Sequence, residues 1–391
     1  MILKEESSLV LGEILVIDLE PTPYKTDLWN AVVDAKKAVV SVIYTEDKNP
    51  APDGGHKYQK WPDRRYDHMS LPGVGILGFL NSSMVVMSTI FRKKPDLIYI
   101  AGYDRFVCMA AILLSCLLRN RFVVHADVYN TGMPFGRFTL AKFVVREFMR
   151  KLVFWKSTSA LVCGLEGIES AIKAGCASEK IVDFPYVIDV DRMRSETPKT
   201  PPLACQEDIN KDALIIMFSG RMIPRKGLET LLSVLPRLKS ISRDWVLWIE
   251  GDGPELVKYQ NLARQLGVID RCRFLGFCQF DVHGWLMCAS DIVVVPSIED
   301  SWGIIVDEGL QLGKLVISSD GVGSGNDRVQ SGINGFIFPA GNASKLGDLM
   351  EKIIDDDTLR LSISELAINR SKTILPRDNA QVLTSMMFAS H

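Results

Sequence analysis

Short apolar runs alternate with longer segments of helical periodicity along the whole chain. The runs are continuous in Val, Ile and Leu, which is typical of parallel strands that helices cover on both faces of a sheet. They lie at residues 13–18, 38–44, 96–102, 121–127, 160–164, 180–187, 213–220, 245–251, 272–277, 291–297, 314–320 and 335–339. Two such series predict an α/β protein with two Rossmann-like, doubly wound domains, one in each half of the chain.

A polar stretch that contains three prolines separates the two series. Residues 195–212, SETPKTPPLACQEDINKD, show no apolar period, and we interpret them as an interdomain linker. The domains are then expected at 1–194 and 213–375, followed by a C-terminal helix over 376–391 that packs back toward the first domain. Ligands bind beyond the carboxyl ends of parallel strands, so we expect the domains to face each other across a ligand-binding cleft.

The composition is that of a globular protein and disfavours several classes. Hydrophobic residues make up 47% and charged residues 24% of the chain, and the net charge of −2 argues against a dedicated nucleic-acid binder. The longest apolar run, residues 106–118, is shorter than the roughly 20 residues of a membrane-spanning helix. The N-terminus lacks a signal-peptide pattern, and the eight cysteines form no C-x-x-C pair. We therefore expect a cytoplasmic protein with reduced thiols.

The first strand of the second domain leads into a basic loop. In SGRMIPRKG, Arg221 and Lys226 lie five residues apart just before a helix. One anion could there meet a guanidinium fork, a mobile ammonium and the N–H groups of the helix start. A solvated basic loop is the alternative interpretation. The next strand ends in GDGP, which we read as an ordinary strand-to-helix turn.

A third strand-end segment, PSIEDSWGIIVDEGLQLGK, carries the candidate carboxylates. Asp300 and Glu308 are eight residues apart, and Glu299 directly precedes Asp300. Gly303 and Ile304 begin a helix, so their N–H groups can face an anion. Glu308 follows about one turn later, in position to accept hydrogen bonds from a ribose diol. Helix capping could explain Glu299 or Asp300, but it explains Glu308 poorly.

These segments resemble the signature of glycosyltransferase family 4 in order and spacing. The pieces are GR-x4-KG, GDGP, FLGF, the carboxylate segment and GVGSGNDRVQSGINGF, and they cover nearly the whole second domain. The resemblance implies the GT-B fold and a retaining glycosyltransferase of hexosyltransferase type. Its donor would be a nucleoside-diphosphate sugar, held without a metal cofactor. Arg221, Lys226, Gly303 and Ile304 would bind the diphosphate, and Glu308 the ribose.

The sugar-side carboxylate is left open by the sequence. The family's E-x7-E motif falls on Asp300 and Glu308, so this chain has Asp where Glu is usual. Glu299 offers the longer side chain one residue earlier. Either Asp300 or Glu299 is therefore expected to contact the transferred sugar as a catalytic group.

The loop after the first strand, DLEPTPYKTD, replaces a glycine-rich turn that family 4 members often have at this place. Thr22, Tyr24 and Lys25 are polar or amphipathic groups that a helix start could direct toward an acceptor. We predict that they bind it. A rigid turn with Thr26 or Asp27 as the helix N-cap is an equally supported and compatible interpretation.

His125 lies at the carboxyl end of a strand, with Asp127 two residues on. A lone strand histidine is more often structural, but the resemblance places a cleft histidine here. We therefore expect His125 to hydrogen-bond the sugar or to orient the acceptor hydroxyl. A D-x-D metal motif at Asp189 and Asp191 is rejected, because the basic loop already supplies positive charge for the diphosphate.

Residues 135–156 form a basic amphipathic segment with interleaved aromatics. This pattern indicates a membrane-surface helix, although a packed helix whose charges face water is the slightly favoured alternative. Membrane contact would place the protein on the inner face of the membrane. The acceptor would then be a lipid-linked glycan of cell-envelope polysaccharide or glycolipid synthesis.

Two other functions remain open from the sequence. A nucleotide-sugar epimerase on the same fold would turn over the donor with no acceptor present. A non-catalytic nucleotide-sugar-binding protein would explain the aspartate at residue 300. A sugar phosphorylase is disfavoured because we find no lysine site for pyridoxal phosphate.

Overall fold

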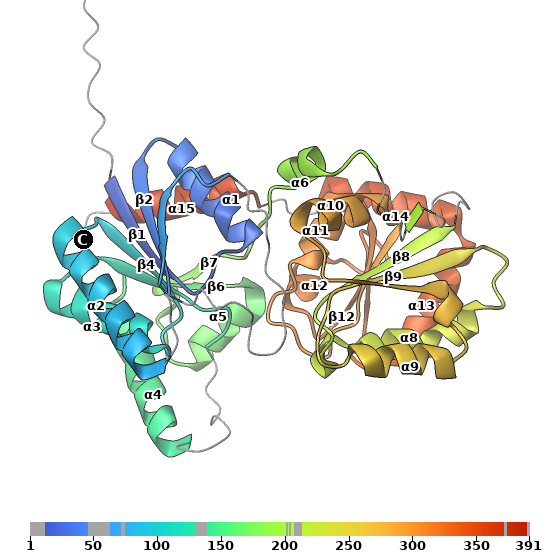
Figure 1. Cartoon of the computed structure of the whole chain (residues 1–391), viewed down its shortest axis with the longest axis horizontal. Coiled ribbons are helices and arrows are strands. Elements are labelled where there is room, and N and C mark those ends of the chain that lie inside the picture. The colour runs from blue at the N-terminus through green and yellow to red at the C-terminus, as the bar shows by residue number, and fades with distance from the viewer. Residues whose placement is uncertain are drawn as a thin grey trace, which may run out of the picture. The chain divides into compact units, whose positions relative to one another are not determined.

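The computed structural model contains two compact α/β units, each built on one parallel sheet (Figure 1). The structure describes residues 12–45, 63–71, 75–129, 139–200, 202, 205–206, 213–370 and 374–388. Of these, the first unit holds the residues up to Pro185 and those from Ile374 onward, and the second unit holds those between. The predicted α/β class with two doubly wound sheets is therefore confirmed.

The first unit has seven strands in the order β3-β2-β1-β4-β5-β6-β7, all parallel. Its strands are β1 Gly12–Asp18, β2 Ala38–Tyr44, β3 Asp67–Ser70, β4 Leu97–Ala101, β5 Phe122–His125, β6 Ser159–Val162 and β7 Ile181–Asp183. Its helices are α1 Pro23–Asp34, α2 Gly75–Lys93, α3 Phe106–Leu118, α4 Thr139–Lys156, α5 Gly164–Lys173 and α15 Pro376–Phe388, with a short 3-10 turn η1 at Ser178–Lys180.

Both faces of this sheet are buried, which explains its continuous apolar strands. Leu15 and Ile17 of β1 pack into a core formed with α2, α3, α4 and α5. Ile14 and Val16 point to the opposite face and pack with α1 and α15. A strand that is covered on both sides needs apolar residues at every position.

The second unit has six parallel strands in the order β10-β9-β8-β11-β12-β13. These are β8 Leu214–Ser219, β9 Trp245–Glu250, β10 Cys272–Gly276, β11 Ile292–Val295, β12 Leu315–Ser319 and β13 Phe336–Phe338. Its helices are α6 Val190–Glu196, α8 Leu228–Leu238, α9 Leu256–Gln265, α10 Phe280–Ala289, α11 Ile305–Gln311, α12 Gly323–Arg328, α13 Ala343–Asp355 and α14 Asp357–Arg370, with 3-10 turns η2 Pro224–Lys226 and η3 Ile269–Arg271.

Strand order reverses beside the first strand of each unit. In the first unit β1 lies between β2 and β4, and in the second β8 lies between β9 and β11. Ligands bind at such switch points, beyond the carboxyl ends of the two diverging strands. The loops after β1 and β4, and those after β8 and β11, are thus the places where chemistry is expected.

The segment before the predicted linker belongs to the second unit, although the sequence placed the first domain at 1–194. The division falls after Pro185. Val190 and Met193 of α6 are buried in the same core as Ile215 and Met217 of β8. The apolar side chains of α6 therefore pull it onto the second sheet. Of the predicted linker, 195–212, residues 201, 203–204 and 207–212 lie outside the described residues.

Helix α15 lies in the first unit and packs against α1 (Figure 1). Ala380 and Leu383 join the core that contains Trp29, and the Asn379 side-chain amide donates to the Pro185 carbonyl at 2.8 Å. The chain thus returns to its first unit after completing the second. Among the described residues, none of the helices is long and apolar enough to cross a membrane.

Candidate active site

The basic loop of the second unit follows β8 at the switch point. It passes Arg221, makes the turn η2 and enters α8 through Gly227. Gly227 has φ +70°, and a Cβ there would collide with the carbonyl oxygen of Pro296. Only glycine therefore allows this loop to pack against the end of β11. The close approach brings Lys226 beside the carboxylate segment.

Lys226 and Asp300 form an ion pair, with Nζ 2.5 Å from Oδ2. Their side chains are 21% and 13% exposed, so water and ligands can still reach them. The sequence assigned Lys226 to the diphosphate and Asp300 or Glu299 to the adjoining sugar, and the structure brings Lys226 and Asp300 together. An ammonium has three donors, so Lys226 can bond Asp300 and still donate to a phosphate oxygen.

Asp300 and Glu299 lie in different surroundings. Asp300 is held by its backbone, which donates to Gly321 O at 2.8 Å. The Glu299 side chain is exposed, and within the described ranges its carboxylate has no polar partner. Its carbonyl accepts from Nη1 of Arg225 at 3.1 Å, so only its backbone is fixed. The structure thus brings the carboxylate of Asp300, rather than that of Glu299, to Lys226 of the basic loop.

Gly303 packs closely beside the Asp300 carboxylate. It has φ +80°, and a Cβ there would lie 2.6 Å from Cγ1 of Val322. Helix α11 begins at Ile305 with Ile304 as its N-cap residue, slightly later than the sequence predicted. The neighbouring Trp302 is buried and donates from Nε1 to Tyr186 O at 3.1 Å, which anchors the turn.

Glu308 lies in the first turn of α11 and is 4% exposed. Its Oε2 is 3.0 Å from Nε2 of His283 in α10, and Nδ1 of the same ring is 2.7 Å from Oε2 of Glu250. Sequence reasoning missed both partners. Glu250 ends β9 just before GDGP, so its place at a strand end was the one available signal.

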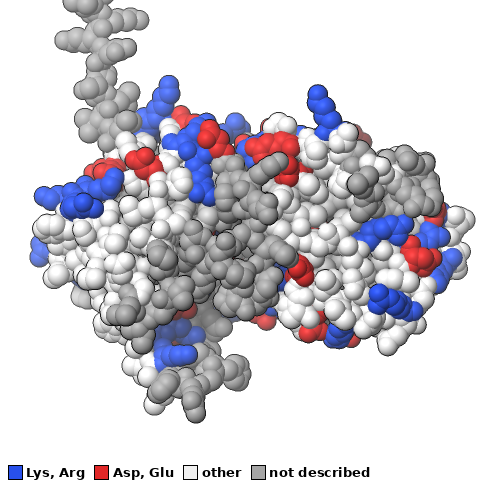
Figure 2. Space-filling view, in the orientation of Figure 1, with Lys and Arg blue, Asp and Glu red and all other residues white. Residues whose placement is uncertain are grey.

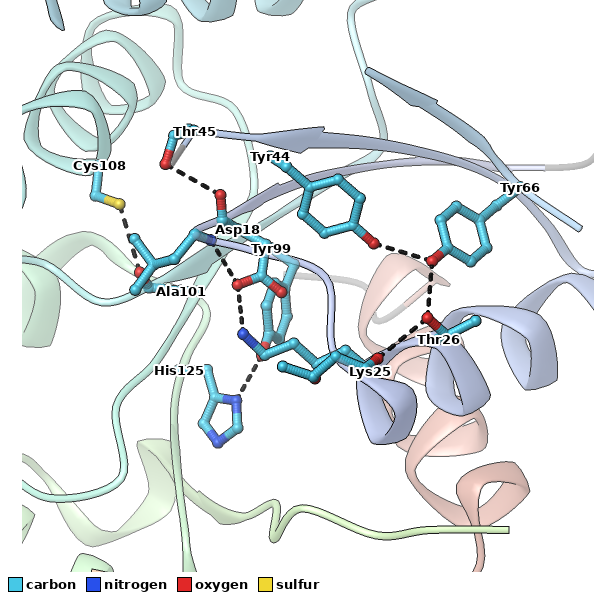
Figure 3. Close-up of polar contacts among 12 residues, drawn as sticks. Asp18, Lys25, Thr26, Tyr44, Thr45, Tyr66, Tyr99, Ala101, Cys108 and His125 are labelled. Carbon is cyan, nitrogen blue, oxygen red and sulfur yellow. Dashed lines mark hydrogen bonds and ion pairs between the residues drawn. The ribbon is translucent and has the colours of Figure 1, made fainter. Parts of the chain in front are cut away.

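The first unit carries a second lysine–aspartate pair at the end of β1 (Figure 3). Nζ of Lys25 is 2.6 Å from Oδ1 of Asp18, and the Asp18 side chain is fully buried. Burial by itself lowers the pKa of Lys25, but the charge of Asp18, together with Tyr24, the hydrogen bond to Asp18 and the charge of Glu20, raises it above its usual value. Lys25, predicted to bind the acceptor, therefore already has a buried partner that the sequence analysis did not consider.

The neighbouring predicted acceptor residues lie at the start of α1. Thr22 is the N-cap residue, but its side chain makes no capping bond, and the prediction of Thr26 or Asp27 as N-cap is wrong. Pro23 explains the earlier start, because its fixed φ suits the first helical position. Thr26 instead donates to Thr22 O at 3.1 Å. Tyr24 is half-buried, and burial raises its pKa.

His125 ends β5 and is 4% exposed. Its Nδ1 is 2.5 Å from the Tyr99 hydroxyl (Figure 3), and its Nε2 is 3.4 Å from Sγ of Cys163. Burial lowers its pKa to about 4, so the ring is neutral at pH 7. Burial also raises the pKa of Tyr99, which therefore acts as donor to Nδ1. This arrangement suits the tautomer with its proton on Nε2.

One group of possible metal ligands occurs among the described residues. His125, Asp127 and Cys163 offer atoms within 4.8 Å of one another. The Cys163 thiol also donates to Phe184 O at 3.8 Å, so it already has a hydrogen-bond partner. In the D-x-D match, Asp189 caps α6 by accepting from Arg192 N at 2.9 Å. That aspartate therefore has a structural role.

Comparison with known proteins identifies similar proteins. Residues 203–370 match the family model described as glycosyl transferases group 1. The chain is 29% identical over 236 residues to the lipopolysaccharide core biosynthesis glycosyltransferase LpsE of Rhizobium meliloti (strain 1021), covering 59% of this chain and 63% of that protein. It is 30% identical over 182 residues to the phosphatidyl-myo-inositol mannosyltransferase of Mycobacterium leprae (strain TN), covering 46% of each. The chain thus spans less than two thirds of the length of these relatives.

The fold is also that of solved structures. The crystal structure of Anabaena Alr3699/HepE in complex with UDP and glucose matches with a TM-score of 0.71 at 18% identity, covering 96% of this chain and 99% of that one. Together with the two Rossmann-like sheets, this likeness defines the GT-B architecture. The family match and the relatives support a glycosyltransferase. The matched segment contains the basic loop and the carboxylate segment.

Proposed function

We propose that this chain is a retaining family 4 glycosyltransferase. It would move a hexose from a nucleoside-diphosphate sugar to an acceptor hydroxyl. The observation that carries the proposal is the Lys226–Asp300 ion pair at the switch point of the second sheet, with Arg221 in the same loop. In this proposal Lys226 would bind phosphate and Asp300, beside it, would bind the sugar, which suits cleavage of a sugar–phosphate bond.

The proposed reaction breaks the bond between the anomeric carbon and the leaving phosphate oxygen. A new bond to the acceptor oxygen forms on the same face of the sugar, and the acceptor proton passes to the leaving phosphate. Negative charge gathers on the diphosphate as its bond breaks. Arg221, Lys226 and the N–H groups of Gly303 and Ile304 stabilise that charge most strongly in the transition state. Glu308 holds the ribose.

Asp300 then contacts the sugar hydroxyls, with Glu299 as the less favoured candidate because its side chain is exposed. His125 stays neutral at pH 7, which suits a hydrogen bond to the sugar or the acceptor rather than storage of a proton. Metal independence is part of the proposal, since the cations are side chains. Transfer should therefore persist after treatment with EDTA and removal of the chelated metal.

The acceptor side is assigned to the first unit. Thr22, Tyr24 and Lys25 at the start of α1 would bind a glycan, in cell-envelope polysaccharide or glycolipid synthesis. The names of two relatives refer to lipopolysaccharide core synthesis and to phosphatidyl-myo-inositol, which supports an acceptor of this kind.

Peripheral contact with the inner face of the membrane is the second part of the proposal. Helix α4 exposes large apolar side chains together with lysines. Its exposed residues include Leu140, Lys142, Val144, Phe148, Lys151, Trp155 and Lys156. Of the predicted segment 135–156, residues 135–138 lie outside the described part of the chain.

Helix α3 contacts both α2 and α4 (Figure 1), and α2 and α3 also expose large apolar side chains. Met84 and Phe91 of α2 are 62% and 65% exposed, and Leu117 of α3 is 78% exposed. Much of the surface near these helices is uncharged, with basic groups toward α4 (Figure 2). An apolar face with a basic border fits an anionic bilayer surface. Vesicles of phosphatidylglycerol and phosphatidylcholine should therefore bind the protein, and pure phosphatidylcholine vesicles should bind it less.

A transfer assay separates the proposed function from its alternatives. The protein is incubated with labelled nucleotide sugars, with and without a lipid extract of bacterial envelopes. A glycosyltransferase moves the label to an acceptor only when the extract is present. An epimerase changes the donor sugar without it, and a binding protein does neither. Either of the last two results would overturn the proposal.

A further inference from the structure

Three buried side chains form a continuous hydrogen-bonded chain in the second unit. Glu250 at the end of β9, His283 in α10 and Glu308 in α11 come from three separate elements. The two carboxylates are 5% and 4% exposed, and the imidazole bridges them at 2.7 and 3.0 Å. Neither Glu250 nor His283 is part of the proposed donor contacts.

The His283 imidazole reduces the repulsion between the two buried carboxylates. Two carboxylates that are buried this close together repel each other. A protonated imidazole donates from both ring nitrogens and lets both carboxylates stay ionised. Burial by itself lowers the pKa of His283, but the charges of Glu250 and Glu308 and its hydrogen bonds to them raise it well above 6.5.

Glu308 depends on this bridge. In the part of the chain that the structure describes, Nε2 of His283 is the only side-chain partner of its carboxylate. That bond uses one lone pair of Oε2, so the ring fixes the orientation of the carboxylate and places a positive charge beside it. Oε1 and the second lone pair of Oε2 can then accept two hydroxyl protons.

We propose that His283 is a positioning residue for donor binding: it holds Glu308 ionised and oriented toward the two ribose hydroxyls, and Glu250 in turn holds His283. This inference rests on the proposed role of Glu308 as the ribose ligand. It adds Glu250 and His283 to that site. Selection of a ribose diol then depends on all three hydrogen-bonded side chains.

Among the described residues, the titratable groups near these three side chains include Asp307, Asp327, Arg328, Cys205 and Cys278. Asp307 precedes Glu308, and burial raises its pKa to about 7 despite Arg328, whose Nε is 3.4 Å away. Burial raises the pKa of the Cys278 thiol, which faces Glu250, to about 12. Asp307 alone would titrate near neutral pH. It is the same in every variant below, so comparison between variants removes its effect.

The test uses two substitutions that each keep one half of the bridge. His283→Gln places an amide nitrogen near the position of Nε2, where it can donate to Glu308. His283→Asn places it near Nδ1, where it can reach only Glu250. Calorimetry on the full chain would measure binding of UDP, GDP and ADP, and of their 2′,3′-dideoxy analogues. Glu308→Ala is the reference, and thermal unfolding checks that each variant is folded.

The wild type should prefer the ribose form of the bound diphosphate by roughly ten- to a hundredfold, the range for hydrogen bonds to a charged group. Glu308→Ala should abolish this preference. His283→Gln should keep it within about threefold, and His283→Asn should lose most of it. In His283→Asn the remaining preference should weaken further as the pH is lowered, because Glu308 then lacks its positive partner.

The failures are distinguishable. If none of the diphosphates binds, or if Glu308→Ala keeps the preference, the proposed function of Glu308 is wrong. If Glu308→Ala loses the preference while both His283 variants keep it at every pH, the positioning role is wrong. Equal weakening of ribose and dideoxy forms in His283→Asn would indicate a merely structural role and would also overturn the inference.

Discussion

Each unit holds a lysine–aspartate pair near the end of its first strand, yet the two pairs suit different tasks. The pair between Lys25 and Asp18 is buried, and the pair between Lys226 and Asp300 is partly open to solvent. A buried pair is costly to separate, so it builds the fold around it. A pair that is partly open to solvent can exchange partners with a ligand at less cost than a buried one. Exposure therefore gives the buried pair a structural role in addition to the proposed acceptor contact of Lys25, and it leaves the other pair open to a ligand.

The two buried histidines, His125 and His283, also differ, because their neighbours shift their pKa values in opposite directions. Burial shifts the pKa of His125 to about 4, because its ring meets mainly a tyrosine hydroxyl and a thiol. His283 is also buried, but two carboxylates raise its pKa well above 6.5. Partners, rather than burial alone, set the sign of the shift. One ring is a neutral hydrogen-bonding group and the other a fixed positive charge.

The largest expected effect comes from separating the buried pair. Lys25→Met should lower the free energy of unfolding by about 3–5 kcal/mol, because it leaves Asp18 charged and buried without a partner. Urea unfolding measures this loss. The double variant with Asp18→Asn should recover part of the stability, and an unchanged unfolding midpoint in the single variant would refute the structural role.

Breaking the ion pair between Lys226 and Asp300 should affect activity rather than stability. Lys226→Met should reduce transfer by roughly 100- to 1000-fold, since it removes a cation from the leaving diphosphate. Its stability should change by less than about 1 kcal/mol. Paired measurements of turnover and urea unfolding test this contrast, and a large loss of stability with normal turnover would reverse the two assignments.

Asp300, which belongs to this pair, and its neighbour Glu299 should differ in their effect on turnover. Asp300→Asn should lower turnover by about 100-fold, in the range for loss of one oriented polar contact. Glu299→Gln should stay within about twofold of the wild type, because its side chain is exposed. Steady-state transfer rates decide between them. Equal losses in both variants would mean that Glu299 shares the sugar contact.

The histidines should shape opposite limbs of the stability–pH profile. For His125, whose folded pKa lies below the unfolded value of about 6.5, stability is present above that pH and falls as the pH drops toward 4, by about 3 kcal/mol in all. For His283, whose folded pKa is raised, stability is present below pH 6.5 and is lost as the pH rises through the folded pKa. His125→Asn should flatten the acid limb and His283→Gln the alkaline limb in unfolding experiments.

Most of the fold could be predicted from the sequence because buried parallel strands have continuous apolar runs. Strand β3 was missed, since its four residues, DHMS, are all exposed and carry no apolar signal. Residues 186–194, which include most of helix α6, were expected in the first domain but lie in the second unit, because the buried side chains of α6 do not reveal which sheet they meet.

The site could be predicted only where its residues lie in one segment. Arg221 and Lys226 share a loop, and Asp300 and Glu308 share a strand-to-helix connection. The contacts between segments could not be predicted: Lys226 and Asp300 are 74 residues apart, and Glu250 and His283 are 33 apart. The order of strands in the sheet brings such residues together, and no local pattern encodes it.

The most direct test of the account is a thermal-shift panel of nucleotide sugars on the wild type and Lys226→Met. A ligand that binds the native state raises its apparent stability. The account predicts that at least one nucleotide sugar raises the Tm of the wild type, and that this shift is lost in Lys226→Met while the ligand-free Tm stays the same. No shift with any nucleotide sugar, or an undiminished shift in the variant, would contradict it.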